Sequence, residues 1–495
     1  MAGLDRRRLL GAVGAAAGGL VLGRPATGAA STDVLVRTRE GVLRGRPGVW
    51  KGIRYAQPPG RFAAPRPVLP WRGVRDALEF GPSAMQPAMP VPGGPPPVGE
   101  QSEDCLFLNV WSPSTAGRRP VVVWLHGGAF VFGTSSAFDG GVLAGRGGLV
   151  VVTINYRLGA FGGLVGAGGP GSGNLRLLDQ VAALRWVRRN IAAFGGDPAN
   201  VTVMGESAGA MSIGALLGAP AAAGLFRRAI VQSGGPRPVV SRAAAARTTD
   251  AVLRFLGVTD PARLSSAPAA DLVAATDAVQ RDTALAEPFG HVLDGVVLPA
   301  HPLDRVGGSV DLLIGTCAKE ADPLLPALGA RFEASARAAL GDREWDRLLR
   351  VYAETAVPGH DARADLLSGW FAVLPSVWLA EAAHRAGASA WQYTFDYAGA
   401  SRFGAGHGSD VPFTFGRVDP AFLAPGADPV AAQRLADTVV DALAAFARTG
   451  DPGWPRFAPD RRASLSFDVP PRRTDDRLPA ARREAWSGID PRTVC

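Results

Sequence analysis

The stretch Met204–Ala210 reads MGESAGA and places Ser207 between two glycines, each two positions away. With 63 glycines in 495 residues this spacing can arise by chance, so its surroundings decide its meaning. The run Val201–Met204 predicts a strand, and Ala208–Leu217 predicts a helix. A serine on such a sharp strand-to-helix turn is exposed to substrate, and the glycines let the backbone pass close to its neighbours. The stretch therefore predicts a nucleophilic serine.

Short apolar runs alternate with helical patterns from Arg119 onward. Each run is apolar almost throughout, which is typical of strands buried on both faces of a mostly parallel sheet. Between two of them, residues 175–194 carry apolar side chains at helical spacing, with arginines expected on the other face. The order predicts a doubly wound α/β fold with helices on both faces of the central sheet. The expected strands are PVVVWLHG, GLVVVTINY, NVTVMG, RRAIVQSG, DLLIGT and AWQYTFDY.

Two long segments, residues 238–300 and 320–388, are rich in alanine and arginine and have helical patterns. We expect helical insertions above the carboxyl edge of the sheet, where ligands bind in open α/β folds. The proline- and glycine-rich span 82–99 is expected to be a long loop, because the patterns on both sides of it belong together. Residues 31–495 are therefore expected to form a single catalytic domain.

A serine hydroxyl becomes an effective nucleophile when a base takes its proton and a carboxylate orients that base. The chain order in α/β-hydrolases is serine, acid, histidine, so the base should follow Ser207. His407 in FGAGHGSDVPF follows a predicted strand, and flanking glycines leave its imidazole free to reach across a cleft. His360, in a polar turn, remains an alternative. The other histidines precede the serine, leave little room for an intervening acid or lie in a helical segment: His126, His291, His301 and His384.

The orienting acid is expected just beyond the strand that ends in LLIGT. Glu320 in LLIGTCAKEADP occupies that position, and Asp322 and Asp311 are the nearest alternatives. The stretch WLHGGAFVFG follows the predicted strand 121–124, and such a loop can aim backbone N–H groups at an oxyanion. In chain order, the WLHGGAFVFG loop, Ser207, Glu320 and His407 each follow a predicted strand. Together these four features predict a serine hydrolase. We expect no metal or cofactor, because the chain has neither a G-K-[S/T] phosphate loop nor an H-E-x-x-H motif.

Several long motifs resemble those of the type-B carboxylesterases, a family that includes para-nitrobenzyl esterases, animal carboxylesterases and cholinesterases. The resemblance covers most of residues 34–470 and implies an α/β-hydrolase fold and a serine esterase that acts on small-molecule esters. The motifs are KGIRYAQPPGRF, SEDCLFLNVW, VVVWLHGGAF, VVTINYRLGAFG, GNLRLLDQVAALRWVRRNIAAFGGDPANVTVMGESAGA, AIVQSG, IGTCAKEAD, GHGSDVPFTFG and FARTGDPGWPRF.

The resemblance also implies a role for individual residues. It makes Ser207 the nucleophile, Glu320 the acid and His407 the base, with Glu206 as a carboxylate that organises charge beside them. The implied oxyanion hole consists of the backbone N–H groups of Gly128, Ala129 and Ala208.

The chain departs from the family pattern at three places. Ala84 stands where relatives often have a cysteine bonded to the one in EDCL, so Cys105 lacks that partner. Gly163 replaces a phenylalanine of the family pattern, which suggests a wider pocket wall. No tryptophan occurs between Trp71 and Trp111, which argues against a choline ester as substrate. Some relatives have lost the nucleophile and serve in adhesion, so a catalytically silent binding module is the alternative function.

Charge and the amino terminus bear on partners and location. The formal charge of +8 comes from scattered arginines rather than a basic cluster, so no nucleic-acid partner is expected. Residues 1–30 combine Arg6–Arg8 with a short apolar run and small residues, which is typical of a twin-arginine signal peptide. The run is too short for stable membrane insertion. We expect a secreted or extracytoplasmic protein exported by the twin-arginine route.

Overall fold

The computed structural model describes residues 33–57, 60–88, 99–282, 287–356, 359–476 and 478–494. The expected signal peptide, residues 1–30, lies outside the described residues, as does Cys495.

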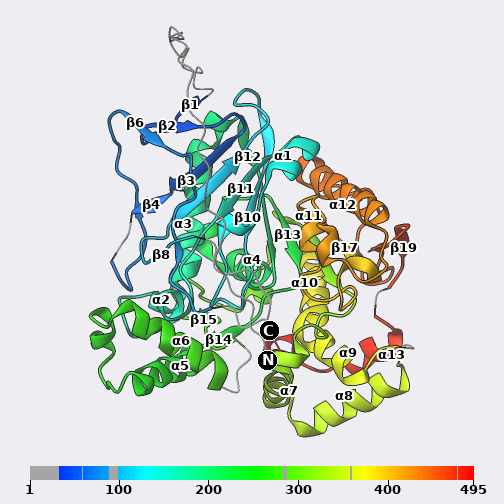
Figure 1. Ribbon diagram of the computed structural model, residues 1–495. Helices are drawn as coiled ribbons and strands as arrows, with labels where there is room; N and C mark the ends of the chain where they lie inside the picture. The colour runs from blue at the N-terminus through cyan, green and yellow to red at the C-terminus, as the bar shows by residue number, and fades with distance from the viewer. Residues whose placement is uncertain are drawn as a thin grey trace, which may run out of the picture.

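A ten-stranded sheet forms the centre of the molecule (Figure 1), with the strand order β19-β18-β17-β16-β13-β12-β10-β11-β9-β3. Every pairing from β18 to β11 is parallel, whereas β19, β9 and β3 are antiparallel to their neighbours. The mostly parallel sheet predicted from the apolar runs is confirmed. In the order given, the strands are Arg472–Thr474, Ser464–Phe467, Ala390–Phe395, Asp311–Cys317, Arg228–Gln232, Gly196–Glu206, Arg119–Leu125, Val150–Ile154, Phe107–Trp111 and Val49–Arg54.

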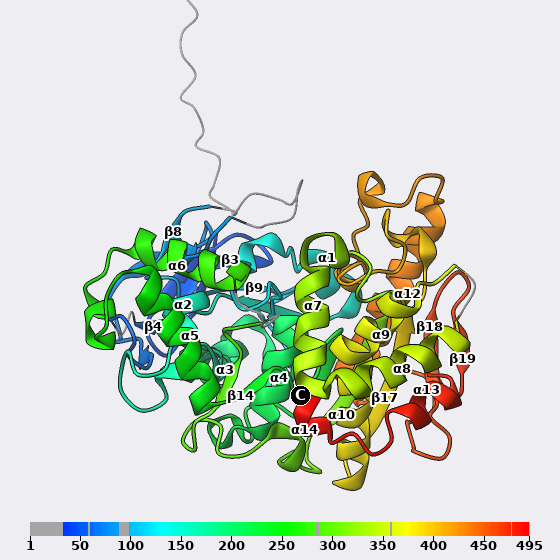
Figure 2. The same ribbon diagram turned by 90° about the horizontal axis from the view of Figure 1, so that it is seen from below.

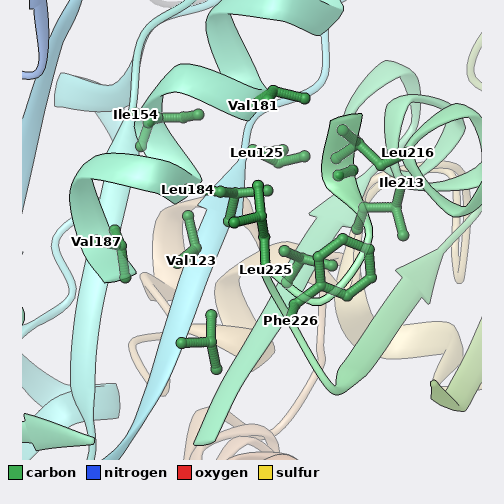
Figure 3. Packing of buried hydrophobic residues seen from close by; sticks show 14 of the residues in the cluster. Val123, Leu125, Ile154, Val181, Leu184, Val187, Ile213, Leu216, Leu225 and Phe226 are labelled. Carbon is green, nitrogen blue, oxygen red and sulfur yellow. The ribbon is translucent and has the colours of Figure 1, made fainter. Parts of the chain in front are cut away.

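Helices cover both faces of this sheet. Side chains alternate along β10, so that Val123 packs with α3 and α4, whereas Trp124 packs with α1 and α12 on the opposite face. Figure 3 shows Val123 of β10 beside Leu184 of α3, with Ile213 of α4 nearby. Figure 1 shows α3 and α12 on opposite sides of the sheet. The covering helices are α1 (Gly141–Gly147), α3 (Leu175–Asn190), α4 (Ala208–Gly218), α10 (Leu374–Arg385) and α12 (Pro429–Thr449).

The two expected insertions lie at the lower edge of the sheet in Figure 1 and form two separate groups in Figure 2. One group comprises α5 (Arg242–Phe255) and α6 (Ala269–Asp282), and the other α7 (Leu325–Leu340), α8 (Asp342–Glu354) and α9 (Ala362–Ser368). We expected the first insertion to be helical, but its two ends form a short parallel ladder of strands. In that ladder β14 (Val239–Ser241) pairs with β15 (His291–Leu293), and β-branched side chains in both strands favour the extended backbone.

A π-helical turn, Gly369–Val373, joins α9 to α10 without a break in the helix. By length and composition alone, the combined stretch Ala362–Arg385 could cross a membrane. Its most apolar window is 89% buried inside the protein, which is the burial of a core helix. π-Helical turns are rare and often occur at functional sites, so this turn is relevant to the site described below.

Short elements complete the fold. The span 82–99 contains β7 at its start, and its residues 89–98 lie outside the described residues. The remaining strands pair as β1 (Val34–Arg37), β2 (Val42–Gly45) and β6 (Val74–Asp76), as β4 (Ala56–Gln57) with β5 (Arg66–Pro67), and as β7 (Ser83–Ala84) with β8 (Gln101–Ser102). The remaining helices are α2 (Gly159–Gly163), α11 (Val411–Thr414), α13 (Ala480–Ala485) and α14 (Pro491–Val494).

Candidate active site

Ser207 lies on the tight turn between β12 and α4, as the sequence predicts. Its backbone has φ 53° and ψ −125°, a conformation that costs free energy and is held by the surrounding structure. Both flanking glycines are required by space. A Cβ at Gly205 would lie 2.8 Å from the carbonyl oxygen of Leu125, and one at Gly209 would lie 2.0 Å from it. In this geometry the turn has no space for a side chain at either position.

His407 lies between the nucleophile and an acid. Its Nε2 is 2.9 Å from the Ser207 hydroxyl, and its Nδ1 is 2.6 Å from Glu320 Oε2. Glu320 is fully buried just after β16, and its other oxygen accepts a hydrogen bond of 2.7 Å from the Cys317 N–H. The structure thus brings together three residues that are far apart in sequence, because each follows a parallel strand at the same edge of the sheet.

The alternative acids and base lie elsewhere. Asp311 is at the start of β16, the opposite end of the strand from Glu320, and accepts a hydrogen bond from the Ser389 N–H. His360 pairs with Asp365 at 3.0 Å. Asp322 is half-buried, and burial raises its pKa. Within the described residues neither aspartate contacts His407, so the geometry singles out Glu320.

Glu206 is a second carboxylate beside the imidazole. Its Oε1 lies 3.3 Å from His407 Nε2, and a Cβ at Gly127 would lie 2.5 Å from its Oε2. Burial raises the pKa of Glu206 to about 7, with the Asp410 and Glu320 carboxylates acting in the same direction and His407 opposing them. Burial lowers the pKa of His407, but Glu206 and the hydrogen bond to Glu320 outweigh it and raise that pKa to about 9.

The loop after β10 carries the predicted oxyanion residues to the nucleophile. A Cβ at Gly127 would lie 3.1 Å from the Cβ of Ser207, so the loop passes directly against the serine. The backbone then turns through positive φ values at Gly128, Ala129 and Phe130 of 116°, 50° and 63°. The Gly128 carbonyl is turned back into the loop, where it accepts hydrogen bonds from the N–H groups of residues 131 and 132. Ala208 is the first residue of α4, whose leading N–H groups have no partner within the helix.

Two further residues at this site were not predicted. Asp410 is buried, accepts a 2.9 Å hydrogen bond from Gln232 Nε2, and has its pKa raised to about 6 by burial and by Glu320. It lies three positions after His407, a spacing that is visible in the sequence. Phe371 belongs to the π-helical turn, and its ring centroid lies 5.1 Å from that of His407. Only the fold brings this aromatic side chain to the histidine.

Gly163 does not widen a pocket wall as the sequence suggests. The space that a side chain would take is filled by Arg176, whose Nη2 lies 2.3 Å from where a Cβ at Gly163 would be. Arg176 is on α3 and fully buried, so the expectation that arginines lie on the outer face of this helix is wrong for Arg176. Arg185 and Arg188 of the same helix are exposed, as expected.

The side chains of Cys105 and Cys317 are both buried. Cys105 and Ala84 line the same cavity of about 300 Å³, which is consistent with the missing disulfide partner. Among the described residues, no group of three or more histidine, cysteine, aspartate or glutamate side chains is arranged to hold a metal ion.

Comparison of the sequence with known proteins shows which family the chain belongs to. The sequence model of the Carboxylesterase family matches residues 33–486. The chain belongs to the carboxylesterase family. This carboxylesterase is 37% identical over 467 residues to the para-nitrobenzyl esterase of Bacillus subtilis (strain 168), covering 88% of this chain and 95% of that protein. It is 36% identical over 458 residues to the phenmedipham hydrolase of Pseudarthrobacter oxydans, covering 84% and 90% respectively.

Solved structures of similar proteins agree with the α/β-hydrolase fold. A carboxylesterase of Geobacillus stearothermophilus superposes with a TM-score of 0.81 at 36% identity, covering 91% of this chain and 99% of that one. A PNB esterase superposes with a TM-score of 0.79 at 35% identity and the same coverage. The predicted family, fold class and carboxylic ester hydrolase activity are confirmed.

Proposed function

We propose that this carboxylesterase hydrolyses small-molecule carboxylic esters through an acyl-enzyme on Ser207. The observation that carries the proposal is the continuous chain from Ser207 Oγ through His407 to Glu320, with separations of 2.9 and 2.6 Å. Both distances are within hydrogen-bond reach, which is the first requirement for a nucleophile and its base.

Acylation uses the residues in a fixed order. His407 Nε2 takes the Ser207 proton as Oγ forms a bond to the ester carbonyl carbon. The resulting oxyanion accepts hydrogen bonds from the N–H groups of Gly128, Ala129 and Ala208. The bond from the carbonyl carbon to the alkoxy oxygen then breaks, and His407 gives its proton to the departing alcohol. The acyl group remains on Ser207.

Deacylation repeats the sequence with water. His407 takes a proton from water, the resulting hydroxide attacks the acyl carbon, and the bond to Ser207 Oγ breaks as His407 returns the proton to it. Glu320 holds the imidazole in the tautomer that presents a free Nε2 and stabilises the imidazolium in both steps. The Cys317 N–H fixes the other Glu320 oxygen, so the carboxylate keeps its orientation.

The silent binding module is not favoured, because a module that had lost catalysis would have no need of this hydrogen-bonded chain. The names of the relatives, para-nitrobenzyl esterase and phenmedipham hydrolase, support small aromatic esters as the first substrates to test. No choline ester is proposed, given the tryptophan-free stretch between Trp71 and Trp111.

We also propose export by the twin-arginine route, on the strength of Arg6–Arg8 and the short apolar run that follows them. Replacing Arg6 and Arg7 together with lysine should hold the enzyme in the cytoplasm of the producing cell. Unchanged secretion of that variant would point to another export route and would leave the esterase proposal intact.

An organophosphonate probe tests the nucleophile. Ser207 should be labelled at one equivalent, and Ser207→Ala should abolish labelling while keeping the melting temperature of the wild type. Residual hydrolysis by the alanine variant should be small, since only the oxyanion hole and binding remain. Wild-type turnover by folded Ser207→Ala would reject the mechanism, as would a label on a different residue.

A further inference from the structure

Arg176 packs against the oxyanion loop, which is the segment after β10 that carries Gly128, Ala129 and Phe130. Its side chain has zero exposure, and its Cζ is 4.9 Å from the ring centroid of Phe130, which belongs to that loop. Its Nη1 donates hydrogen bonds to the carbonyl oxygens of Phe289 and Gly290, the residues that precede β15. One guanidinium therefore connects α3, the oxyanion loop and the first insertion.

The charge of Arg176 is not neutralised by a partner of its own. The neighbouring carboxylate, Asp179, is engaged by Arg157 through hydrogen bonds of 2.7 and 2.8 Å. Within the described part of the chain, no carboxylate forms an ion pair with Arg176, and its Nε and Nη2 have no acceptor. Burying a charge without an ion-pair partner is unfavourable for stability. A buried charge without an ion-pair partner is expected where a side chain serves function rather than stability.

Phe130 is the residue on which Arg176 acts. Its φ of 63° is unusual for a residue with a bulky side chain. Its ring is buried and contacts both the Arg176 guanidinium and the His291 ring, whose centroid lies 5.0 Å away. Its carbonyl accepts a 2.7 Å hydrogen bond from the Gly159 N–H. Because Phe130 directly follows Ala129, its backbone conformation helps to fix the path of the loop that carries the N–H groups of Gly128 and Ala129. Such strained backbone persists only when the surroundings hold it.

We propose that Arg176 is a positioning residue for ester hydrolysis, which holds Phe130 in its left-handed conformation and fixes a positive charge behind the oxyanion loop. The inference rests on the proposed acyl-enzyme mechanism, because the oxyanion it supports forms only when Ser207 attacks. A fixed charge in a water-excluded interior stabilises developing negative charge more than it would in water. Its effect falls on the transition state rather than on the bound ester, so it should be seen in kcat.

Arg176→Met removes the charge and keeps a side chain of similar length. Its matched control is Arg185→Met, which removes an exposed arginine from the same helix. We expect kcat of Arg176→Met to fall on the order of 10- to 100-fold, while KM changes less than about threefold. The inhibition constant of a trifluoromethyl ketone, which forms an oxyanionic adduct with the serine, should rise by a similar factor to the loss in kcat. The control should match the wild type in all three quantities.

Gly163→Ala provides a second variant that keeps the charge but displaces it, because the new Cβ would lie 2.3 Å from Nη2. Gly169→Ala is its control, since a Cβ there meets nothing within 4 Å. Gly163→Ala should lower kcat without lowering the affinity for ester, and Gly169→Ala should change neither. If Arg176→Met does not fold, the Gly163→Ala result decides the matter.

Wild-type kcat and ketone affinity in a folded Arg176→Met protein would overturn the inference, as would a loss confined to KM. Unchanged kcat in Gly163→Ala, with Arg176→Met unfolded, would overturn it too. Failure of the underlying mechanism is distinguishable. In that case the wild type itself would not bind the ketone and Ser207→Ala would retain activity, whatever the Arg176 variants do.

Discussion

Glu206→Gln should move the acid limb of the pH profile of kcat/KM to lower pH. The carboxylate is the largest influence that raises the pKa of His407, which lies at about 9. His407 must be neutral to take the serine proton, so kcat/KM of the wild type should increase with pH and level off above that value. Glu206 has a pKa of about 7 and is therefore ionised over the range in which His407 loses its proton.

The size of the shift follows from the 3.3 Å between Glu206 Oε1 and His407 Nε2. Coulomb's law with an effective dielectric constant of ~20 gives about 5 kcal/mol for two full charges at that distance. Glutamine keeps a carbonyl dipole in place, and removing one charge also changes hydration, so only part of this energy is lost. We expect the limb to move down by about one to three pH units, where each unit corresponds to about 1.4 kcal/mol.

The assay is release of nitrophenol from its acetate ester, read at the isosbestic wavelength so that the signal does not depend on pH. Glu354→Gln, at an exposed position of α8, is the matched control and should keep the wild-type profile. An acid limb of Glu206→Gln at the wild-type pH, or at a higher one, would refute the assignment of Glu206 as the group that holds His407 protonated.

Three other variants test the site and its surroundings. Glu320→Gln should lower kcat on the order of 10³- to 10⁴-fold in steady-state kinetics, because an amide cannot stabilise the imidazolium. Asp322→Asn should cost far less, and the reverse ranking would reject Glu320 as the acid. Ala84→Cys should form a disulfide with Cys105, seen by peptide mapping, and raise stability by about 3 kcal/mol in urea unfolding; a free thiol at both positions would contradict this. Gly209→Ala should destabilise the fold by at least about 2 kcal/mol in the same assay, because its Cβ would lie 2.0 Å from a carbonyl oxygen of β10, and unchanged stability would show that the turn can relax.

The central sheet could be predicted because its strands are buried on both faces. Runs such as 121–125 and 312–314 consist of apolar residues alone, and their short length and β-branched side chains favour buried parallel strands. The β14–β15 ladder was missed, because three-residue strands are too short to show a period against a helical background. The π-helical turn was missed because nothing in Gly369–Val373 distinguishes it locally from an α-helix.

Ser207 and Glu320 could be found because parallel strands end at a common edge, and both residues follow closely after a strand. His407 lies twelve residues after the end of β17, and it was found from its place in the chain order and its flanking glycines. Arg176 could not be placed in the same way. Helical spacing shows which way a side chain points, but burial of its charge depends on the space left at Gly163, a residue on another helix. Sequence patterns therefore cannot predict the burial of a polar side chain when that burial depends on space left by a residue of another helix.

The central claim is that ester hydrolysis passes through an acyl group on Ser207. Its most direct test is intact mass spectrometry after rapid acid quenching of the enzyme during turnover of a nitrophenyl ester, followed by peptide mapping. The account predicts one added acyl mass, located on the peptide that contains Ser207 and absent in Ser207→Ala. Turnover by the wild type with no acyl adduct at any quench time, or with the adduct on another residue, would contradict it.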